Sequence, residues 1–152
     1  MKISKIKSIE VLDSRARPTL CTTVYLDDGS TGQAMVPSGA STGQLEAYEL
    51  RDKNDQRYGG LGVQNAVKNS EEALKILKGV SSEDQLIIDN KLIELDATEN
   101  KSKLGANAIL SVSLACARAA SNSMSISLYE YLNIMYKGCL LYTSDAADDD
   151  RG

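Results

Sequence analysis

The hydrophobic pattern changes its period once along the chain, and this change limits the folds open to it. Up to Val36 the apolar residues fall in β-branched or alternating runs, over Ile3 to Val11, Thr19 to Leu26 and Thr31 to Val36. Such runs predict strands. From Val63 onward the apolar residues recur at helical spacing. Strands followed by helices, without strand–helix alternation, predict an α+β fold with helices on one face of a small sheet.

Turn-forming residues separate the three predicted strands. Pro18 lacks a backbone donor and marks a turn before the second strand. Asp28-Gly29 follows Leu26 and is a dipeptide that favours a tight primed hairpin turn. The third strand stops at Pro37. The sequence therefore predicts a three-stranded antiparallel meander.

The second half predicts a bundle of about four helices. The first runs from Val63 to Leu77, and Gly79 is placed to close it in a left-handed cap. The third, over Asn107 to Ala120, is rich in small residues that let another backbone come close, so we expect it to be central and buried.

Capping boxes mark the starts of the other two helices. Ser82 with Gln85 predicts the start of the second helix, and Ser127 with Glu130 predicts the start of the last, which runs through Met135. Gly138 is expected to end the bundle.

Composition excludes several classes of function. The 152 residues include no histidine, which disfavours zinc sites and Ser-His or Cys-His nucleophiles, so chemistry must rest on carboxylates, lysines or hydroxyls. A net charge of −4 without a basic block argues against nucleic acid as a partner. There is no apolar run of membrane-spanning length and no leader, so we expect a cytoplasmic protein with no membrane partner and with reduced cysteines.

The stretch after the third strand, VPSGASTGQLEAYELRD, is the most informative. Ser38, Gly39, Ala40, Ser41, Thr42 and Gly43 have little side-chain volume and cannot anchor a core. A loop of this kind can cradle a phosphate or present a hydroxyl to magnesium. It fits neither a Walker loop nor a dinucleotide fingerprint. The alternative is a mobile surface connection made of turn-forming residues.

Four blocks in order carry a family resemblance: DSRARPT, VPSGASTG with EAYELRD, YGGLGVQNAV, and ENKSKLGANAILSVSLACARAA. Together they resemble the amino-terminal domain of enolase, from about Lys5 to Tyr136. The resemblance implies a capping domain over residues 1–138 that sits beside a larger α/β barrel, its missing partner here. It also implies a parent enzyme that dehydrates 2-phosphoglycerate to phosphoenolpyruvate with two magnesium ions, in a homodimer or larger assembly.

The resemblance places the catalytic lysine and glutamate in the barrel, so this chain is expected to hold no catalytic residue and to be inactive alone. It makes residues 38–43 a lid over the substrate and Ser41 a ligand of the second magnesium. Small residues would let that backbone come close to phosphate and metal. Arg15 is a candidate interface or barrel-facing residue, with a solvated or locally paired arginine as the alternative.

Other positions depart from the family or have a simpler interpretation. Ala16-Arg17 replaces the usual Gly-Asn, and Cys21 replaces an acid that pairs with a partner subunit. Lys101 and Lys103 are interpreted as a solvated connector rather than as catalytic lysines. Glu46, Glu49 and Arg51 either hold the base of the lid or form surface charge entering a short helix, and the second interpretation is favoured. Cys116 is interpreted as a packing residue.

The end of the chain, 139–152, resembles translated sequencing-adapter sequence and is acidic, so we expect it to be non-native and disordered. The leading hypothesis is a truncated enolase. The alternative is a free-standing interaction module that reuses the enolase cap without catalysis. A third hypothesis, the least favoured, is another member of the wider superfamily that acts on a different carboxylate.

Overall fold

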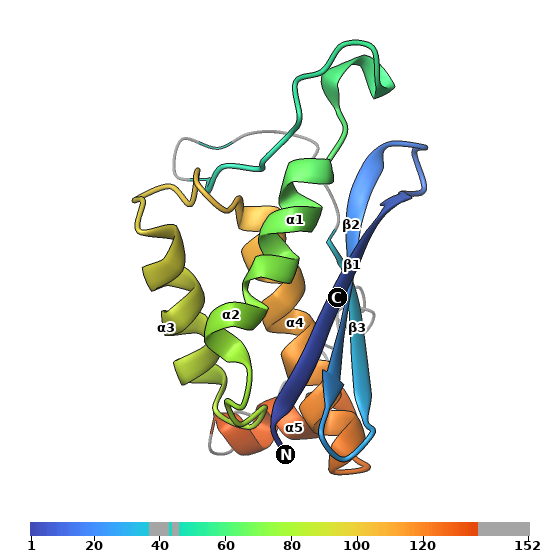
Figure 1. Ribbon diagram of the computed structural model, residues 1–152. Helices are drawn as coiled ribbons and strands as arrows, with labels where there is room; N and C mark the ends of the chain where they lie inside the picture. The colour runs from blue at the N-terminus through green and yellow to red at the C-terminus, as the bar shows by residue number, and fades with distance from the viewer. Residues whose placement is uncertain (37–42, 44–45, 137–152) are drawn as a thin grey trace, which may run out of the picture.

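The computed structural model describes residues 1–36, 43 and 46–136. Its sheet has the order β1-β2-β3, with β1 over Ile3–Leu12, β2 over Pro18–Leu26 and β3 over Thr31–Val36. Both strand pairs are antiparallel. The helices lie on one side of this sheet (Figure 1). The predicted α+β fold and its meander are confirmed.

The helical half follows a short 3-10 turn, η1, over Tyr58–Gly60. The helices that the structure describes are listed here in order: α1 (Gln64–Glu72), α2 (Leu74–Leu77), α3 (Gln85–Asp96), α4 (Ala106–Ser123) and α5 (Leu128–Met135). The single helix predicted from Val63 to Leu77 is therefore divided at Ala73. Gly79 has the expected positive φ of 81°, but its N–H donates to Ile3 of β1 and not to the helix end.

The hairpin between β2 and β3 differs from the prediction. A primed type I turn needs positive φ at both central residues, whereas Gly29 has a φ of 88° and Asp28 keeps a negative φ. The Asp28 carboxylate accepts the Ser30 N–H at 2.9 Å, and the Leu26 N–H donates to the Ser30 carbonyl at 2.9 Å. The connection is a wider turn closed by a glycine bulge, because the aspartate side chain bonds locally.

The two predicted capping boxes have different outcomes. Ser127 and Glu130 form the reciprocal pair at the start of α5. Ser82 does not cap α3, because it is buried and bonds to the Met1 carbonyl, and α3 begins only at Gln85. Pairing with the chain's first residue is a long-range contact that the local pattern does not encode.

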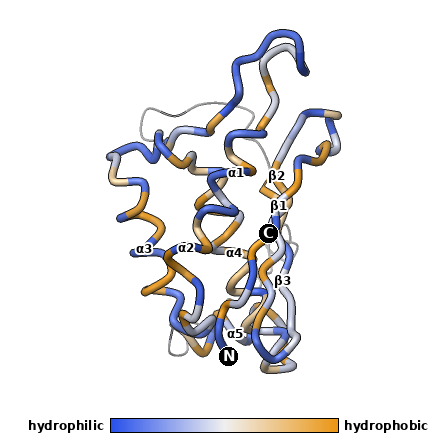
Figure 2. Tube along the Cα trace, in the orientation of Figure 1, coloured by the Kyte–Doolittle hydropathy of each residue, from blue (hydrophilic) through white to orange (hydrophobic). Residues whose placement is uncertain are grey.

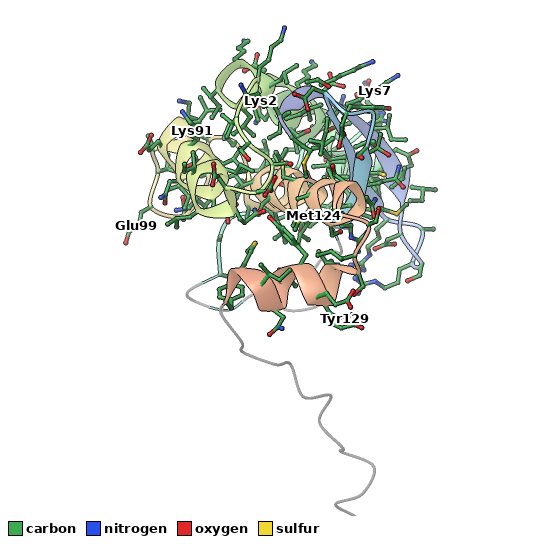
Figure 3. All side chains as sticks on the ribbon, turned by 90° about the horizontal axis from the view of Figure 1, so that it is seen from below. Lys2, Lys7, Lys91, Glu99, Met124 and Tyr129 are labelled. Carbon is green, nitrogen blue, oxygen red and sulfur yellow. The ribbon has the colours of Figure 1, made fainter. Side chains whose placement is uncertain are left out.

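The core lies between the sheet and α4, the central helix, as predicted. Figure 2 shows hydrophobic colour along the strands and the packed helices, while the projecting segment around residues 53–57 is mainly hydrophilic. Cys116 of α4 is fully buried, and burial raises the pKa of its thiol to about 12, which agrees with a packing role. Figure 3 shows α5 beside α4, with the exposed Tyr129 on its outer side.

Candidate functional site

The candidate site is the connection that leaves β3. Ser38, Gly39, Ala40, Ser41 and Thr42 lie outside the described residues, so their predicted roles stay predictions. On the near side, Val36 pairs with Leu20, and its carbonyl accepts a hydrogen bond from the Thr19 hydroxyl. On the far side, the Gly43 N–H donates to the Glu46 carboxylate at 2.9 Å. The connection is thus described at both of its ends.

The residues Glu46 to Asp52, which we call the stem, return the chain from this connection to the body of the protein. They are not helical, so the favoured interpretation, a short surface helix, is wrong. The Tyr48 N–H donates to the Asn100 carbonyl at 2.7 Å, and the Tyr48 carbonyl accepts from the Ala106 N–H at 2.8 Å. The stem is therefore joined to the loop that precedes α4.

Asn107, in the first turn of α4, holds the next part of the stem. Its side-chain oxygen accepts the Leu50 N–H at 3.1 Å, and its amide nitrogen donates to the Leu50 carbonyl at 3.1 Å. Asn107 is 4% exposed, so these bonds are shielded from water. The sequence places Asn107 at the start of the predicted third helix, but the pattern gives its side chain no role. The available signal was an amide placed directly at a helix start.

Arg51 ties the stem to two further segments. Its guanidinium donates to the Pro18 carbonyl at 2.6 Å and to the Leu61 carbonyl at 2.7 Å, and it pairs with Glu49 at 2.6 Å. The Arg51 side chain is 14% exposed. These contacts correspond to the alternative that sequence analysis had ranked second, in which Glu49 and Arg51 hold the base of the lid.

Asp52 completes the stem at the start of α1. Its two carboxylate oxygens accept the N–H groups of Gln64 at 2.8 Å and Asn65 at 2.9 Å. These N–H groups belong to the helix start, where a carboxylate is favoured by the helix dipole. The last residue of the stem is therefore fixed to a different helix from the one that holds Leu50.

The loop that receives the stem is itself organised by the buried Asp96 at the end of α3. Burial acts to raise the pKa of Asp96, but hydrogen bonds from Thr98 and from the Leu104 N–H, at 2.6 Å, outweigh it and lower the pKa. Lys101 and Lys103 donate to carbonyl oxygens near the same helix end. The Lys101 and Lys103 ammonium groups lie near the C-terminal end of α3, where the helix dipole favours positive charge. This position agrees with a structural role.

A small hollow of about 170 Å³ lies where the stem meets α4, lined by residues that include Val36, Glu46, Glu49 and Leu110. A larger one of about 450 Å³ lies at the other end of the molecule, between the start of α3 and the end of α5. The smaller hollow is lined by Val36 and Glu46, which stand on either side of the predicted lid in the sequence. Leu110 is 44% exposed there, which leaves an apolar side chain beside the stem.

Arg15 lies in the turn between β1 and β2. Asp13 organises this turn by accepting the N–H groups of Arg15 and Arg17, at 2.8 and 2.9 Å, and its carboxylate is 3.8 Å from the Arg15 guanidinium. These bonds lower the pKa of Asp13, with the Arg17 N–H contributing most. Ala16 has a φ of 56°, so alanine adopts here a left-handed conformation that glycine adopts more readily.

Cys21 lies on the open face of the sheet between Ile9 and Met35, its partners in register on β1 and β3. It is buried, whereas Ile9 and Met35 are about half exposed, at 51% and 56%. An apolar patch therefore stands on the face of the sheet that the helices leave uncovered.

Comparison with known families and proteins agrees with this architecture. The model of the enolase N-terminal domain matches residues 3–132. The chain belongs to the enolase family. An enolase of Methanopyrus kandleri is 58% identical over 132 residues, which make up 86% of this chain and 31% of that relative. The chain therefore spans about a third of the length of that enolase.

Among the described residues, no group of three acidic or cysteine side chains is placed to hold a metal ion. None of the helices in this part of the chain is long and apolar enough to cross a membrane.

Proposed function

We propose that this chain is the lid-bearing domain of a magnesium-dependent phosphopyruvate hydratase, which dehydrates 2-phospho-D-glycerate to phosphoenolpyruvate in glycolysis. Membership of the enolase family and the 58% identity to an enolase support the assignment of the parent enzyme. The observation that carries it for this chain is the SGASTG segment together with a stem fixed to five other segments of the fold. A connection without a task would not need such anchoring.

Ser41 is proposed as the residue that binds the second magnesium ion, within a lid of Ser38, Gly39, Ala40, Ser41, Thr42 and Gly43. A hydroxyl oxygen is a suitable ligand for this hard cation, but it supplies one of several positions. The other ligands belong to the barrel in this proposal. When bound, magnesium supplies positive charge opposite the negative charge that develops on the substrate carboxylate. The lid contributes by excluding water from that site.

The chain alone is proposed to be inactive, because the general-base lysine and the glutamate that aids loss of the hydroxyl belong to the barrel. Its main partner is that barrel, and the parent is a cytoplasmic homo-oligomer. The exposed apolar side chains include Ile9 and Met35 on the open sheet face and Leu110 beside the stem. They support a domain whose surface packs against a partner. Arg15, 45% exposed at its side chain, is proposed to lie at an interface.

The test is complementation. The full 152-residue chain is mixed with magnesium and the separately expressed remainder of the Methanopyrus kandleri enolase, and phosphoenolpyruvate is followed by ultraviolet absorbance. We expect activity from the mixture and none from either part. Ser41→Ala should abolish it, whereas Ser102→Ala, an exposed serine in the loop before α4, should not.

Two results would overturn the proposal. Activity that survives Ser41→Ala unchanged would remove the metal-binding role of the lid. A chain that docks on the barrel, shown by sedimentation, without restoring turnover would favour the non-catalytic interaction module.

A further inference from the structure

We infer that Asn107 is a positioning residue for the proposed lid, because its amide binds both the N–H and the carbonyl of Leu50 and so fixes the stem that follows the lid in the chain. The inference rests on the proposed function for its catalytic consequence. Its structural part rests on the described residues alone.

Two hydrogen bonds, which we call the clamp, join Leu50 to the oxygen and the nitrogen of the Asn107 side-chain amide. One bond is accepted from the Leu50 N–H and one is donated to the Leu50 carbonyl, each at 3.1 Å. An amide that pairs with both the N–H and the C=O of one residue resembles a single hydrogen-bonded residue pair of an antiparallel sheet. It fixes the position and the orientation of Leu50, because a twist of the stem would break at least one of the bonds.

The Asn107 side chain that binds Leu50 belongs to α4, the longest of the helices that the structure describes. Asn107 belongs to the first turn of α4, an 18-residue helix whose buried residues pack between the sheet and its neighbours. A side chain on such a helix has a well-defined position. The bonds from Asn107 therefore fix Leu50 relative to the core.

Gly105 shows how closely the stem and α4 approach. With a φ of 95°, it leaves no room for a side chain: an added Cβ would lie 2.5 Å from the Asn107 Oδ1 and 2.5 Å from the Leu50 Cβ. Glycine is required both by the backbone conformation and by the space. The contact between Leu50 and Asn107 therefore depends on a glycine at position 105.

The hydrogen bonds also show where the fixed part of the stem begins. From Tyr48 to Asp52 the chain is bonded to the Asn100 loop, to α4, to Pro18 and to α1. Before Tyr48, Glu46 bonds to Gly43 within the same connection, and both Glu46 and Ala47 are exposed. Asn107 thus holds the stem two residues after Tyr48, where the stem's bonds to the rest of the fold begin.

Asn69 offers a matched control. It is also an asparagine that donates to main-chain carbonyls of the segment before α4, at 2.9 Å to Leu104 and 3.2 Å to Lys103. It stands on α1, and its side-chain amide donates to that segment, whereas the Asn107 amide donates to the stem. Asn69→Ala should therefore cost stability without releasing Leu50.

The first measurement is hydrogen exchange on the full chain, with Asn107→Ala, Asn107→Asp and Asn69→Ala compared with the wild type. We expect the Leu50 amide to exchange about tenfold faster in Asn107→Ala, relative to the global change, because its acceptor is gone. Asn107→Asp keeps an acceptor oxygen and should restore much of the protection. Asn69→Ala should leave Leu50 protected.

The second measurement uses the complementation mixture, at barrel concentrations that saturate docking. Asn107→Ala should lower kcat about tenfold with less effect on KM, because a misplaced stem impairs closure more than encounter with substrate. Asn69→Ala should keep the wild-type kcat once docked.

The outcomes separate the two claims. Equal Leu50 exchange in Asn107→Ala and Asn69→Ala would overturn the anchor, and equal kcat in the two docked variants would overturn its role in positioning. If the wild-type mixture is inactive, the proposed function fails, while the exchange result still supports or overturns the anchor.

Discussion

Gly32 of β3 lies directly against Ala119 of α4, so closely that a Cβ on the glycine would stand 2.1 Å from the Ala119 backbone nitrogen. The same Cβ would be 2.3 Å from the Ala115 carbonyl oxygen. Strand and helix therefore pack backbone to backbone. This contact explains why α4 carries small residues on this side: a larger side chain would hold the helix away from the sheet.

Gly32→Ala should destabilise the fold by about 3 kcal/mol, because the obstructing atoms belong to a helix backbone that cannot rotate away. Urea unfolding measures the change. Thr31→Ala is the control, since Thr31 is an exposed neighbour on the same strand and should change the free energy by less than about 0.5 kcal/mol. Equal effects of the two substitutions would contradict the backbone contact.

Ala16→Gly should stabilise the chain by about 0.5 kcal/mol, because Ala16 has a φ of 56°, where a Cβ is crowded and glycine is not. The melting temperature should rise. Ala47→Gly is the control: Ala47 is exposed with negative φ, so glycine there only adds freedom to the unfolded chain and should destabilise. A fall in stability with Ala16→Gly would show that the turn carries no strain.

The parts of the fold that local sequence predicts are those with local causes. The strands follow from β-branched and alternating residues, and the α5 capping box forms because Ser127 and Glu130 are partners within one turn. The prediction fails at Ser82, whose bonds go to Met1, far away in sequence. It also fails at the hairpin, where the bond from Ser30 to Asp28 competes with the primed turn.

The candidate site is divided in the same way. The proposed lid can be recognised in the sequence because its small residues form one continuous string. The stem is not, since Arg51 binds the carbonyls of Pro18 and Leu61, and a backbone acceptor has no signature of residue type. Only the three-dimensional structure shows that these segments meet.

Arg51→Lys should destabilise the chain by about 2 kcal/mol, because a lysine cannot reach two carbonyls and a carboxylate with the geometry of a guanidinium. Denaturant unfolding measures the loss. Arg118→Lys is the matched control: Arg118 is exposed and donates to the Gln33 carbonyl at 2.8 Å, a bond that an ammonium can replace. If Arg51→Lys lowered the free energy of unfolding no more than Arg118→Lys does, the bonds of the Arg51 guanidinium would not be holding the stem.

Glu10 joins β1 to the segment before α1. Its carboxylate pairs with the Arg57 guanidinium and accepts the Val63 N–H at 2.7 Å. The Glu10 side chain is 7% exposed. The bond from Arg57 is the largest influence on its pKa, which lies below the ordinary value of 4.5 despite the opposing effect of burial. The charged form of Glu10 is therefore the one that the fold stabilises.

This gives stability a specific dependence on pH. A carboxyl with a lowered folded pKa contributes stability that is complete above its unfolded pKa, 4.5, and is lost as the pH falls through the lower folded value. Glu10→Gln should be less stable than the wild type at pH 7, and the difference should narrow below the unfolded value. Urea unfolding at a series of pH values measures this. The control, Glu94→Gln at an exposed position, should keep a small and constant difference. A constant difference for Glu10→Gln as well would mean that the Arg57 pair does not favour the ionised carboxylate.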